Sequence, residues 1–438
     1  MKCGEKYHVK ILKMVSKGKG LSRVEDQVVF IPYVLPEEEV EIKIRQIKKD
    51  YLLADKISIL SPSPFRVDPP CPLFEKCGGC QWQMVDYSHQ LQYKTELLKE
   101  TLLRIGKLET DLTPPVPASD PFHYRQRVKF QTKFEIGKMV IGFYRPESNE
   151  IVPMESCFTI SPLLNALFKE VSLFLNKTAD LFSSLKEIHF SLSSNGAEVL
   201  IELNGKDLPK RESAIQNLFH LPFPIKGIIL SGEKGEIKVL GKRNLSNIIK
   251  DANHPEKEIK IRSSIGGFSQ VNWEMNLKLI ETLLSWANLS GKENILELYS
   301  GNGNFTLSLA KECRQITAVE ENPAALEDLR FNLQANQIEN CSVRKGSVQT
   351  ALSRWDRANF PIDLLVLDPP REGIDHSSLK SVLKISPGRI LYISCDPATL
   401  ARDLKVLSVK YTIQRIAPFD MFPQTAHIET LTELKLSK

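Results

Sequence analysis

Along the first sixty residues, hydrophobic and polar positions alternate in short runs, which is the pattern of strands that bury one face. Glycines and prolines separate the runs and mark the turns between them. The four predicted strands are Tyr7–Val15, Val28–Tyr33, Val40–Ile47 and Ala54–Leu60. Short strands at this spacing are typical of a small closed barrel, so residues 1–60 are predicted to form an OB-like β-barrel.

Residues 61–265 mix two periodicities and are predicted to form a central α+β domain. Apolar side chains recur at helical spacing through Asp86–Lys107, which predicts a helix. In Tyr124–Phe134 the period changes to two, which predicts a strand.

From Gly267 onward the pattern alternates strictly between strands and helices, as in a doubly wound α/β sheet. Asn294–Ser300 and Ile316–Glu320 are predicted strands, and between them a glycine-rich turn leads into a helix that begins at Phe305. Residues 266–438 are therefore predicted to form a Rossmann-like domain. Such domains bind their ligands at the carboxyl ends of the strands.

Composition bounds the class of protein. A chain of 438 residues is long enough for two or three domains, and its net charge of +5 permits an anionic partner. No run has the length of a membrane span and the N-terminus lacks a signal-peptide core, so a cytoplasmic protein without membrane contact is expected. In that reducing compartment, eight cysteines favour metal or catalytic thiols over disulfides.

Three cysteines lie close together in CPLFEKCGGCQW: Cys71, Cys77 and Cys80. The two glycines among them let the backbone fold tightly around a ligand. Cys157 is the nearest cysteine that completes a set of four. Four thiolates suit a 4Fe–4S cluster or a tetrahedral zinc ion, and the spacing leaves both open, with unliganded cysteines as a third alternative.

Cys395 follows the apolar run LYIS and precedes an Asp-Pro pair that ends the strand. The thiol therefore lies where a strand of the sheet meets its loop, a position in which a cysteine can also simply pack. A second strand, in PIDLLVLDPPR, ends at Asp368 and leads to Arg371, and the polar loop DMFPQTAHIE closes at Glu429. A thiol, two acids and an arginine at one sheet edge indicate chemistry.

The turn Gly301–Asn304 contains the first glycines of a dinucleotide fingerprint, but Thr306 stands where the third glycine would be. A nucleoside without a pyrophosphate therefore fits better. Glu320, at the end of its strand, is predicted to bind ribose hydroxyls, and S-adenosylmethionine (SAM) is the candidate cofactor.

A basic stripe is predicted on the strand Tyr124–Phe134, where the period of two places Arg125, Arg127 and Lys129 on one face. Such a stripe can track a phosphate backbone. A solvated outer face is the alternative interpretation.

Six segments in chain order resemble signatures of the RNA 5-methyluridine methyltransferases, specifically the iron–sulfur branch that modifies large-subunit ribosomal RNA. They are CPLFEKCGGCQWQ, FSQVN (Phe268–Asn272), LYSGNGNFTL (Leu298–Leu307), LDPPREG, SCDPATLARD and DMFPQTAHIE. The resemblance implies an N-terminal TRAM barrel, a central iron–sulfur domain and a SAM-dependent catalytic domain.

The same resemblance implies a role for each matching residue. The 4Fe–4S ligands would be Cys71, Cys77, Cys80 and Cys157. The SAM contacts would be Gln270, Tyr299, Asn304, Glu320, Ser347 and Asp368. The sequence departs from the family at three positions, with a glutamate at Glu297, a short side chain at Ser347 and a tyrosine in place of phenylalanine at Tyr299.

Residue chemistry agrees with this resemblance. Carbon 5 of uracil is a poor nucleophile, but a thiolate from Cys395 that adds to carbon 6 turns the ring into an enolate whose carbon 5 attacks the SAM methyl group. Glu429 would then take the carbon 5 proton so that the thiol can leave. The uridine must be unstacked to reach such a site. We therefore expect a monomeric enzyme that methylates carbon 5 of a uridine in large-subunit ribosomal RNA.

Three other functions share part of this pattern. An amino-group methyltransferase would place an aromatic residue after the acidic Pro-Pro motif, where this chain has Arg371, and would need no thiol. A catalytically silent iron–sulfur RNA-binding assembly factor would not need Cys395 and Glu429. A transfer RNA uridine-5 methyltransferase shares the chemistry, but that branch typically lacks the four cysteines.

Overall fold

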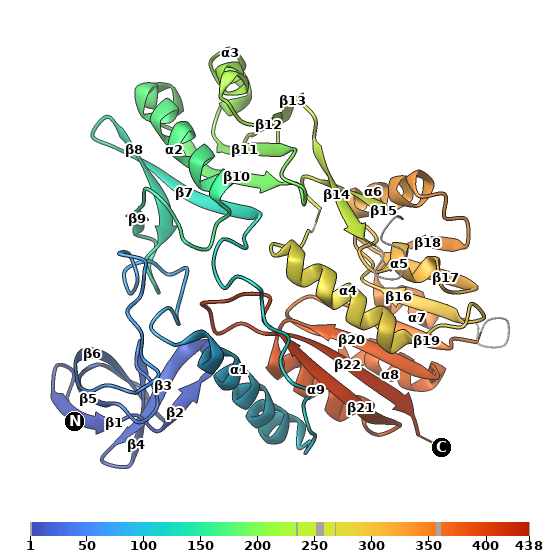
Figure 1. Cartoon of the computed structure of the whole chain (residues 1–438), viewed down its shortest axis with the longest axis horizontal. Coiled ribbons are helices and arrows are strands. Elements are labelled where there is room, and N and C mark those ends of the chain that lie inside the picture. Colours follow the sequence, from blue (N-terminus) through green and yellow to red (C-terminus); the bar gives the residue numbers. More distant parts are fainter. Residues whose placement is uncertain (1, 234, 251–257, 268, 356–360, 438) are drawn as a thin grey trace.

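The computed structural model describes residues 2–233, 235–250, 258–267, 269–355 and 361–437, whose strands form three large sheets and one separate hairpin (Figure 1). From the N-terminus to the C-terminus, the sheets are coloured blue, green and yellow to red. Among the described residues, no helix has both the length and the apolar character that a membrane crossing requires.

The N-terminal sheet curls around its own hydrophobic core, and its strand order is β1-β5-β6-β4-β3-β2. Tyr7–Val15, predicted as one strand, is two strands because the chain changes partner at Ile11, from β5 to β3. β3 was not predicted because glycine is typical of turns and Gly20 lies within this strand. Gly20 is there because the strand packs closely against Val34: a Cβ at this position would lie 2.5 Å from Val34 Cγ2. The strands are β1 (Lys6–Lys10), β2 (Lys13–Val15), β3 (Lys19–Val24), β4 (Gln27–Pro32), β5 (Glu39–Ile47) and β6 (Leu52–Ser61).

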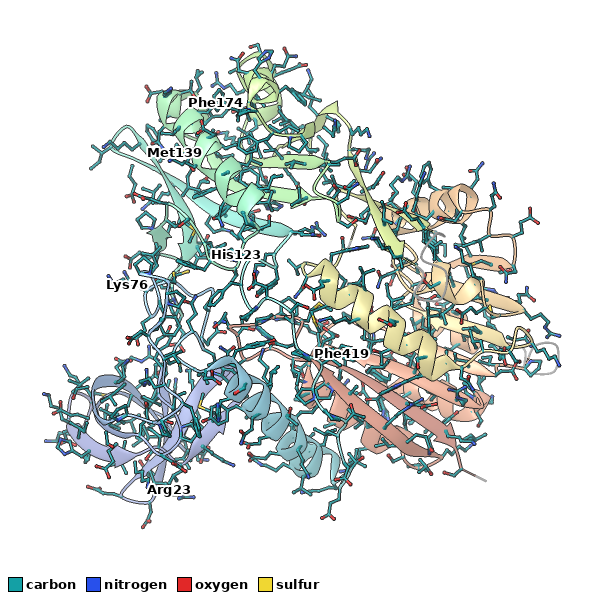
Figure 2. All side chains as sticks on the ribbon, viewed as in Figure 1. Arg23, Lys76, His123, Met139, Phe174 and Phe419 are labelled. Carbon is teal, nitrogen blue, oxygen red and sulfur yellow. The ribbon has the colours of Figure 1, made fainter. Side chains whose placement is uncertain are left out.

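The central sheet has the order β13-β12-β11-β10-β7-β8-β9, and helix α2 (Pro162–Lys177) covers one of its faces. Met139 and Phe174 mark the two sides of this contact in Figure 2. The strands are β7 (Arg127–Glu135), β8 (Lys138–Tyr144), β9 (Ile151–Pro153), β10 (Leu185–Leu192), β11 (Val199–Gly205), β12 (Ile225–Ser231) and β13 (Ile237–Gly241).

The C-terminal sheet has the order β18-β17-β16-β19-β20-β22-β21. The predicted alternation of strands and helices is confirmed as far as β21, which a loop rather than a helix joins to β22. The first five of these strands are parallel, whereas β22 runs antiparallel to both β20 and β21. The strands are β16 (Asn294–Leu298), β17 (Gln315–Glu320), β18 (Cys341–Lys345), β19 (Leu364–Leu367), β20 (Arg389–Ser394), β21 (Tyr411–Phe419) and β22 (Glu429–Leu436).

Both faces of the C-terminal sheet are covered, which explains why its inner strands read as continuous apolar runs. One face carries α4 (Trp273–Ala287), α5 (Thr306–Ala310) and α6 (Pro323–Ala335). The other face carries α7 (Val348–Ser353), α8 (His376–Ile385) and α9 (Pro397–Leu407).

Packing crosses the expected boundary at residue 265 in two places. Helix α1 (Tyr87–Thr101), extended by a π-turn at Leu102–Gly106, buries Leu98 and Leu102 in the core that contains α9. The hairpin of β14 (Asn244–Lys250) and β15 (Glu258–Ser264) lies on α6. There the Arg262 guanidinium pairs with Asp328 at 2.6 Å.

The contact between α1 and the C-terminal region includes a buried ion pair. Lys94 Nζ lies 2.5 Å from Asp420 Oδ1, and both side chains are 1% exposed. The same ammonium donates to the Phe422 carbonyl at 3.1 Å. Burial lowers the pKa of Lys94, and Asp420 opposes that shift, so the ammonium depends on its partner.

We predict that Lys94→Met destabilises the protein by about 3–5 kcal/mol, because it leaves a carboxylate buried without its counter-ion. Trp82, whose ring lies 5.9 Å from Lys94 Nζ, reports on unfolding through its fluorescence in urea. Lys99→Met is the control on the same helix, since its side chain is 65% exposed. Equal unfolding midpoints for the two variants would contradict the prediction.

Candidate active site and cysteine cavity

A cavity of about 460 Å³ lies at the carboxyl edge of the C-terminal sheet. It is formed at the ends of β16, β17, β19 and β20, where β22 begins, and by the segment that precedes α4. Seven of the eight residues predicted for catalysis and cofactor binding line it. They are Gln270, Tyr299, Asn304, Glu320, Asp368, Cys395 and Glu429.

Ser347 is the exception. It forms the N-cap of α7, where its hydroxyl accepts the Thr350 N–H at 3.3 Å, and it is not among the residues that line this cavity. Phe268, the first residue of the FSQVN segment, lies outside the described residues.

The turn after β16 is fixed by Glu320. Its Oε2 accepts the Gly301 N–H at 2.8 Å, and its Oε1 accepts the N–H groups of Glu321 and Asn322. Tyr299, at the start of the turn, has a φ of 64°, which is unfavourable for a residue with a side chain and is frequent at ligand sites. The lone pairs that Glu320 keeps free can accept hydroxyl groups.

Two side-chain contacts around this turn were not predicted. Asn276, buried on α4, exchanges two amide hydrogen bonds of 2.8 and 2.9 Å with Asn304 and so orients its side chain. Thr306 donates its hydroxyl to Glu297 Oε2 at 2.6 Å. Burial raises the pKa of Glu297 to about 8. Through Thr306 this acid holds the start of α5, and it is not among the residues that line the cavity.

The thiol and the acids meet through strand pairing. Ser394 pairs with Thr430 between β20 and β22, and the Thr430 hydroxyl donates to the Ser394 carbonyl at 3.0 Å. Cys395 and Glu429 therefore occupy the neighbouring register position at the strand ends. Asp368 reaches the same cavity from the end of β19.

Burial dominates the electrostatics of this site. It raises the pKa of Asp368 to about 7, and burial together with the Asp368 charge raises the pKa of Glu429 well above its ordinary value. Burial and the nearby Glu429 raise the pKa of the Cys395 thiol to about 11. Arg371 acts in the opposite direction on Cys395 and Glu429, because its positive charge favours both anions.

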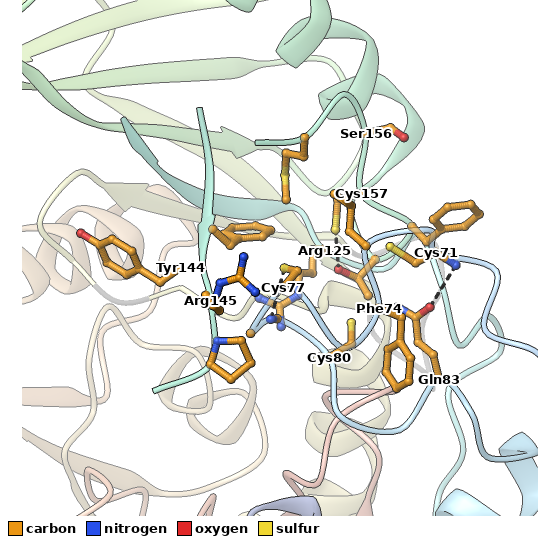
Figure 3. Close-up of a pocket in the computed structure, with 18 of the residues that line it drawn as sticks. Cys71, Phe74, Cys77, Cys80, Gln83, Arg125, Tyr144, Arg145, Ser156 and Cys157 are labelled. Carbon is orange, nitrogen blue, oxygen red and sulfur yellow. Dashed lines mark hydrogen bonds between the residues drawn. The ribbon is translucent and has the colours of Figure 1, made fainter. Parts of the chain in front are cut away.

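A second cavity, of about 470 Å³, contains all four cysteines of the predicted cluster (Figure 3). Cys71, Cys77 and Cys80 come from the loop before α1, and Cys157 comes from the segment before α2. The Gly78 N–H bonds to the Tyr144 carbonyl at 2.9 Å, which fastens the cysteine loop to β8. Within the described residues, no three His, Cys, Asp or Glu side chains lie close enough together to hold a single metal ion.

The basic stripe does not form as predicted. β7 begins at Arg127, so Arg125 lies before the strand, where its backbone bridges to Ile160 and Asn272, and its guanidinium enters the cysteine cavity. The alternation in the sequence continues beyond the end of the ladder, which is why Arg125 was placed wrongly. Arg127 donates to the Ser269 carbonyl at 3.3 Å, and Lys129, half exposed, pairs with Glu187 at 2.7 Å.

Comparisons with known proteins find relatives over nearly the whole chain. A family model described as tRNA (uracil-5-)-methyltransferase matches residues 86–436, and a TRAM domain model matches residues 2–57. An uncharacterized RNA methyltransferase from Caldanaerobacter subterraneus subsp. tengcongensis is 33% identical over 98% of each chain. Another from Halalkalibacterium halodurans is 31% identical over 98% of this chain and 96% of its own.

A solved structure has a similar fold. The Pyrococcus abyssi tRNA (uracil-54, C5)-methyltransferase in complex with S-adenosyl-L-homocysteine superposes with a TM-score of 0.75 and 23% identity, over 97% of this chain and 99% of that one. The resemblance found in the sequence is thereby confirmed at the level of the family. This chain belongs to the tRNA (uracil-5-)-methyltransferase family and is an RNA methyltransferase with an N-terminal TRAM domain.

Proposed function

We propose that this enzyme transfers the methyl group of SAM to carbon 5 of a uridine in large-subunit ribosomal RNA, through a covalent bond between Cys395 and carbon 6. The observation that carries the proposal is the register of β20 and β22. It sets a thiol and a buried carboxylate side by side at one end of a nucleoside-sized cavity.

The reaction needs both groups in turn. The Cys395 sulfur forms a bond to carbon 6, and the electrons of the ring double bond move toward oxygen 4. Bound SAM supplies an electrophilic methyl group, which carbon 5 takes. Glu429 then removes the carbon 5 proton, the double bond re-forms and the bond between sulfur and carbon 6 breaks.

The raised pKa values suit this sequence of proton transfers. A thiol whose pKa is about 11 holds its proton at neutral pH, so addition requires a base nearby. Burial raises the pKa values of Asp368 and Glu429, so each of them, once deprotonated, is a stronger base than an exposed carboxylate. Arg371 stabilises the thiolate once the proton has left.

The residues that line the cavity fit SAM. Gln270, Asn304 and Glu320 supply polar groups for its amino acid and ribose parts, and Tyr299 supplies a ring on which the adenine can stack. Thr306 occupies the position of the third glycine of a dinucleotide fingerprint, so the turn does not suit a pyrophosphate. Its hydroxyl is already bonded to Glu297. A contact from Ser347 would require α7 to approach the cavity.

A 4Fe–4S cluster fits the cysteine cavity better than zinc does. Zinc holds its sulfur ligands at about 2.3 Å and so needs them tightly gathered, which the four thiols are not. A cluster of eight atoms needs the space that this cavity has. The Arg125 guanidinium, whose Nε has no hydrogen-bond partner among the described residues, would offset the negative charge of the thiolates.

Ribosomal RNA is proposed as the substrate because the four cysteines match the iron–sulfur branch of the family. Transfer RNA is the second candidate, because the solved neighbour with a TM-score of 0.75 is a tRNA (uracil-54, C5)-methyltransferase. Incubation of the enzyme and SAM with each unmodified RNA, followed by mapping of the product, decides between them. Failure to methylate either RNA would favour a silent assembly factor.

We predict opposite effects for two substitutions in the reaction cavity. Cys395→Ala removes the nucleophile, so neither methyl transfer nor a protein–RNA adduct should form. Glu429→Gln keeps the thiol but removes the base, so a methylated adduct should accumulate and survive denaturing electrophoresis. Turnover of the Glu429 variant at the wild-type rate would contradict the mechanism, as would an adduct formed without Cys395.

We predict that protein purified without oxygen is brown and contains about four irons per chain. Cys157→Ala should lose most of this iron and its visible absorbance, because one of four ligands is gone. Cys3→Ala is the matched control, since that thiol is exposed and distant from the cavity in sequence. Colourless wild-type protein with stoichiometric zinc would be incompatible with the cluster.

We predict that Lys129 and Arg127 differ in their effects on binding. Lys129→Ala should weaken RNA binding and reduce its salt dependence by about one charge, with SAM affinity unchanged. Arg127→Ala should also weaken SAM binding, because its guanidinium holds the Ser269 carbonyl beside Gln270. Anisotropy titrations over a range of salt and calorimetry with SAM measure the two effects, and identical profiles for both variants would refute the distinction.

A further inference from the structure

Gln424 is a buried residue in the loop that joins β21 to β22 and that carries Phe422 to the reaction cavity. Its backbone adopts a φ of 67°, a conformation that is unfavourable for a residue with a side chain. Such a conformation persists only where the surroundings hold it in place.

The surroundings here are hydrogen bonds to segments far away in the sequence. The Gln424 N–H donates to Gln90 Oε1, and Gln90 Nε2 donates to Gln424 Oε1, each at 3.0 Å. The Gln424 carbonyl accepts the N–H groups of Gln81 and Trp82, also at 3.0 Å each. The backbone groups and the side-chain oxygen of Gln424 are thus all bonded to α1 or to the cysteine loop.

The two residues before Gln424 are held in the same way. Lys94 Nζ and the Thr425 hydroxyl both donate to the Phe422 carbonyl, at 3.1 and 2.7 Å. The Tyr124 hydroxyl donates to the Pro423 carbonyl at 3.1 Å. Three consecutive carbonyls, from Phe422 to Gln424, therefore have fixed partners, and the turn presents Phe422 to the cavity in one orientation.

We propose that Gln424 and Gln90 are positioning residues, which act through the Phe422 turn to hold the wall of the reaction cavity beside Cys395 and Glu429. This rests on the proposed function above for what the wall encloses. A buried pair of amides contributes little through apolar packing, but when every donor and acceptor is paired it specifies one geometry. Because Gln81 follows Cys80, the same anchor joins the cysteine cavity to the reaction cavity.

The test uses the holoenzyme and three variants. Gln90→Leu removes the amide pair and keeps the size of the side chain. Of this pair, Gln424→Gly removes only the bond from Gln90 Nε2 to the Gln424 side chain, while glycine adopts the left-handed φ readily and keeps the backbone bonds, including the one from the Gln424 N–H to Gln90 Oε1. Gln92→Leu is the control. It makes the same substitution on the exposed face of α1, where the Gln92 side chain donates a hydrogen bond to Glu96 at 2.8 Å.

Hydrogen exchange measured by mass spectrometry should be faster than in wild type across residues 421–428 in Gln90→Leu and Gln424→Gly. In Gln92→Leu the exchange rate of this segment should be unchanged. The kcat for methyl transfer should fall at least tenfold in the first two, since small displacements near reacting atoms cost this much or more. The KM for SAM should stay within about twofold, because Gln270, Asn304 and Glu320 are untouched.

Unchanged exchange across residues 421–428 in either of the two variants would overturn the proposal, as would a loss of activity that appears in KM for SAM rather than in kcat. The exchange measurement does not depend on the chemistry. If wild-type enzyme methylated no RNA, the proposed function would fail, while the exchange result would still decide whether Gln90 and Gln424 hold the turn.

Discussion

The antiparallel pairing of β22 with β20 is the constraint on which the reaction site depends. A purely parallel sheet would bring only carboxyl ends of strands to this edge, whereas β22 enters in the opposite direction and begins there. The first residue of β22, Glu429, consequently lies beside the residue that follows β20, Cys395. Thr430 fixes the register by donating its hydroxyl to the Ser394 carbonyl. A slip of one residue would turn the carboxylate to the opposite face of the sheet.

The same burial that aligns these groups also sets their proton affinities. Asp368, Glu429 and Cys395 all have pKa values above their ordinary ranges, because burial disfavours their charged forms. Arg371 is the cationic residue among those that line the cavity, and it favours the anionic forms of Cys395 and Glu429. Because Asp368 shifts the pKa of Glu429 and Glu429 shifts that of Cys395, the three groups titrate as a coupled set.

Local signals in the sequence predicted the parts of the site that end strands. Asp368 and Cys395 each follow an apolar run that a proline stops, and Glu320 ends its own strand, so their positions could be inferred. Partners that meet only in three dimensions were missed, because Gln90 and Gln424 are separated by 334 residues and no local pattern pairs one with the other. Arg125 was misplaced for a related reason, since alternation shows which side chains share a face but not where the ladder ends.

The two cavities are connected through backbone hydrogen bonds. Cys80 lines the cysteine cavity, and the next two residues donate their N–H groups to Gln424, which adjoins the turn that carries Phe422 into the reaction cavity. Covalent bonds from four thiolates to one cluster would restrain this loop far more firmly than the hydrogen bonds at its glycines. Methyl transfer by the thiol route consumes no electron. The proposed cluster would therefore act as a fixed point for the cysteine loop and so stabilise the geometry of the wall beside Cys395.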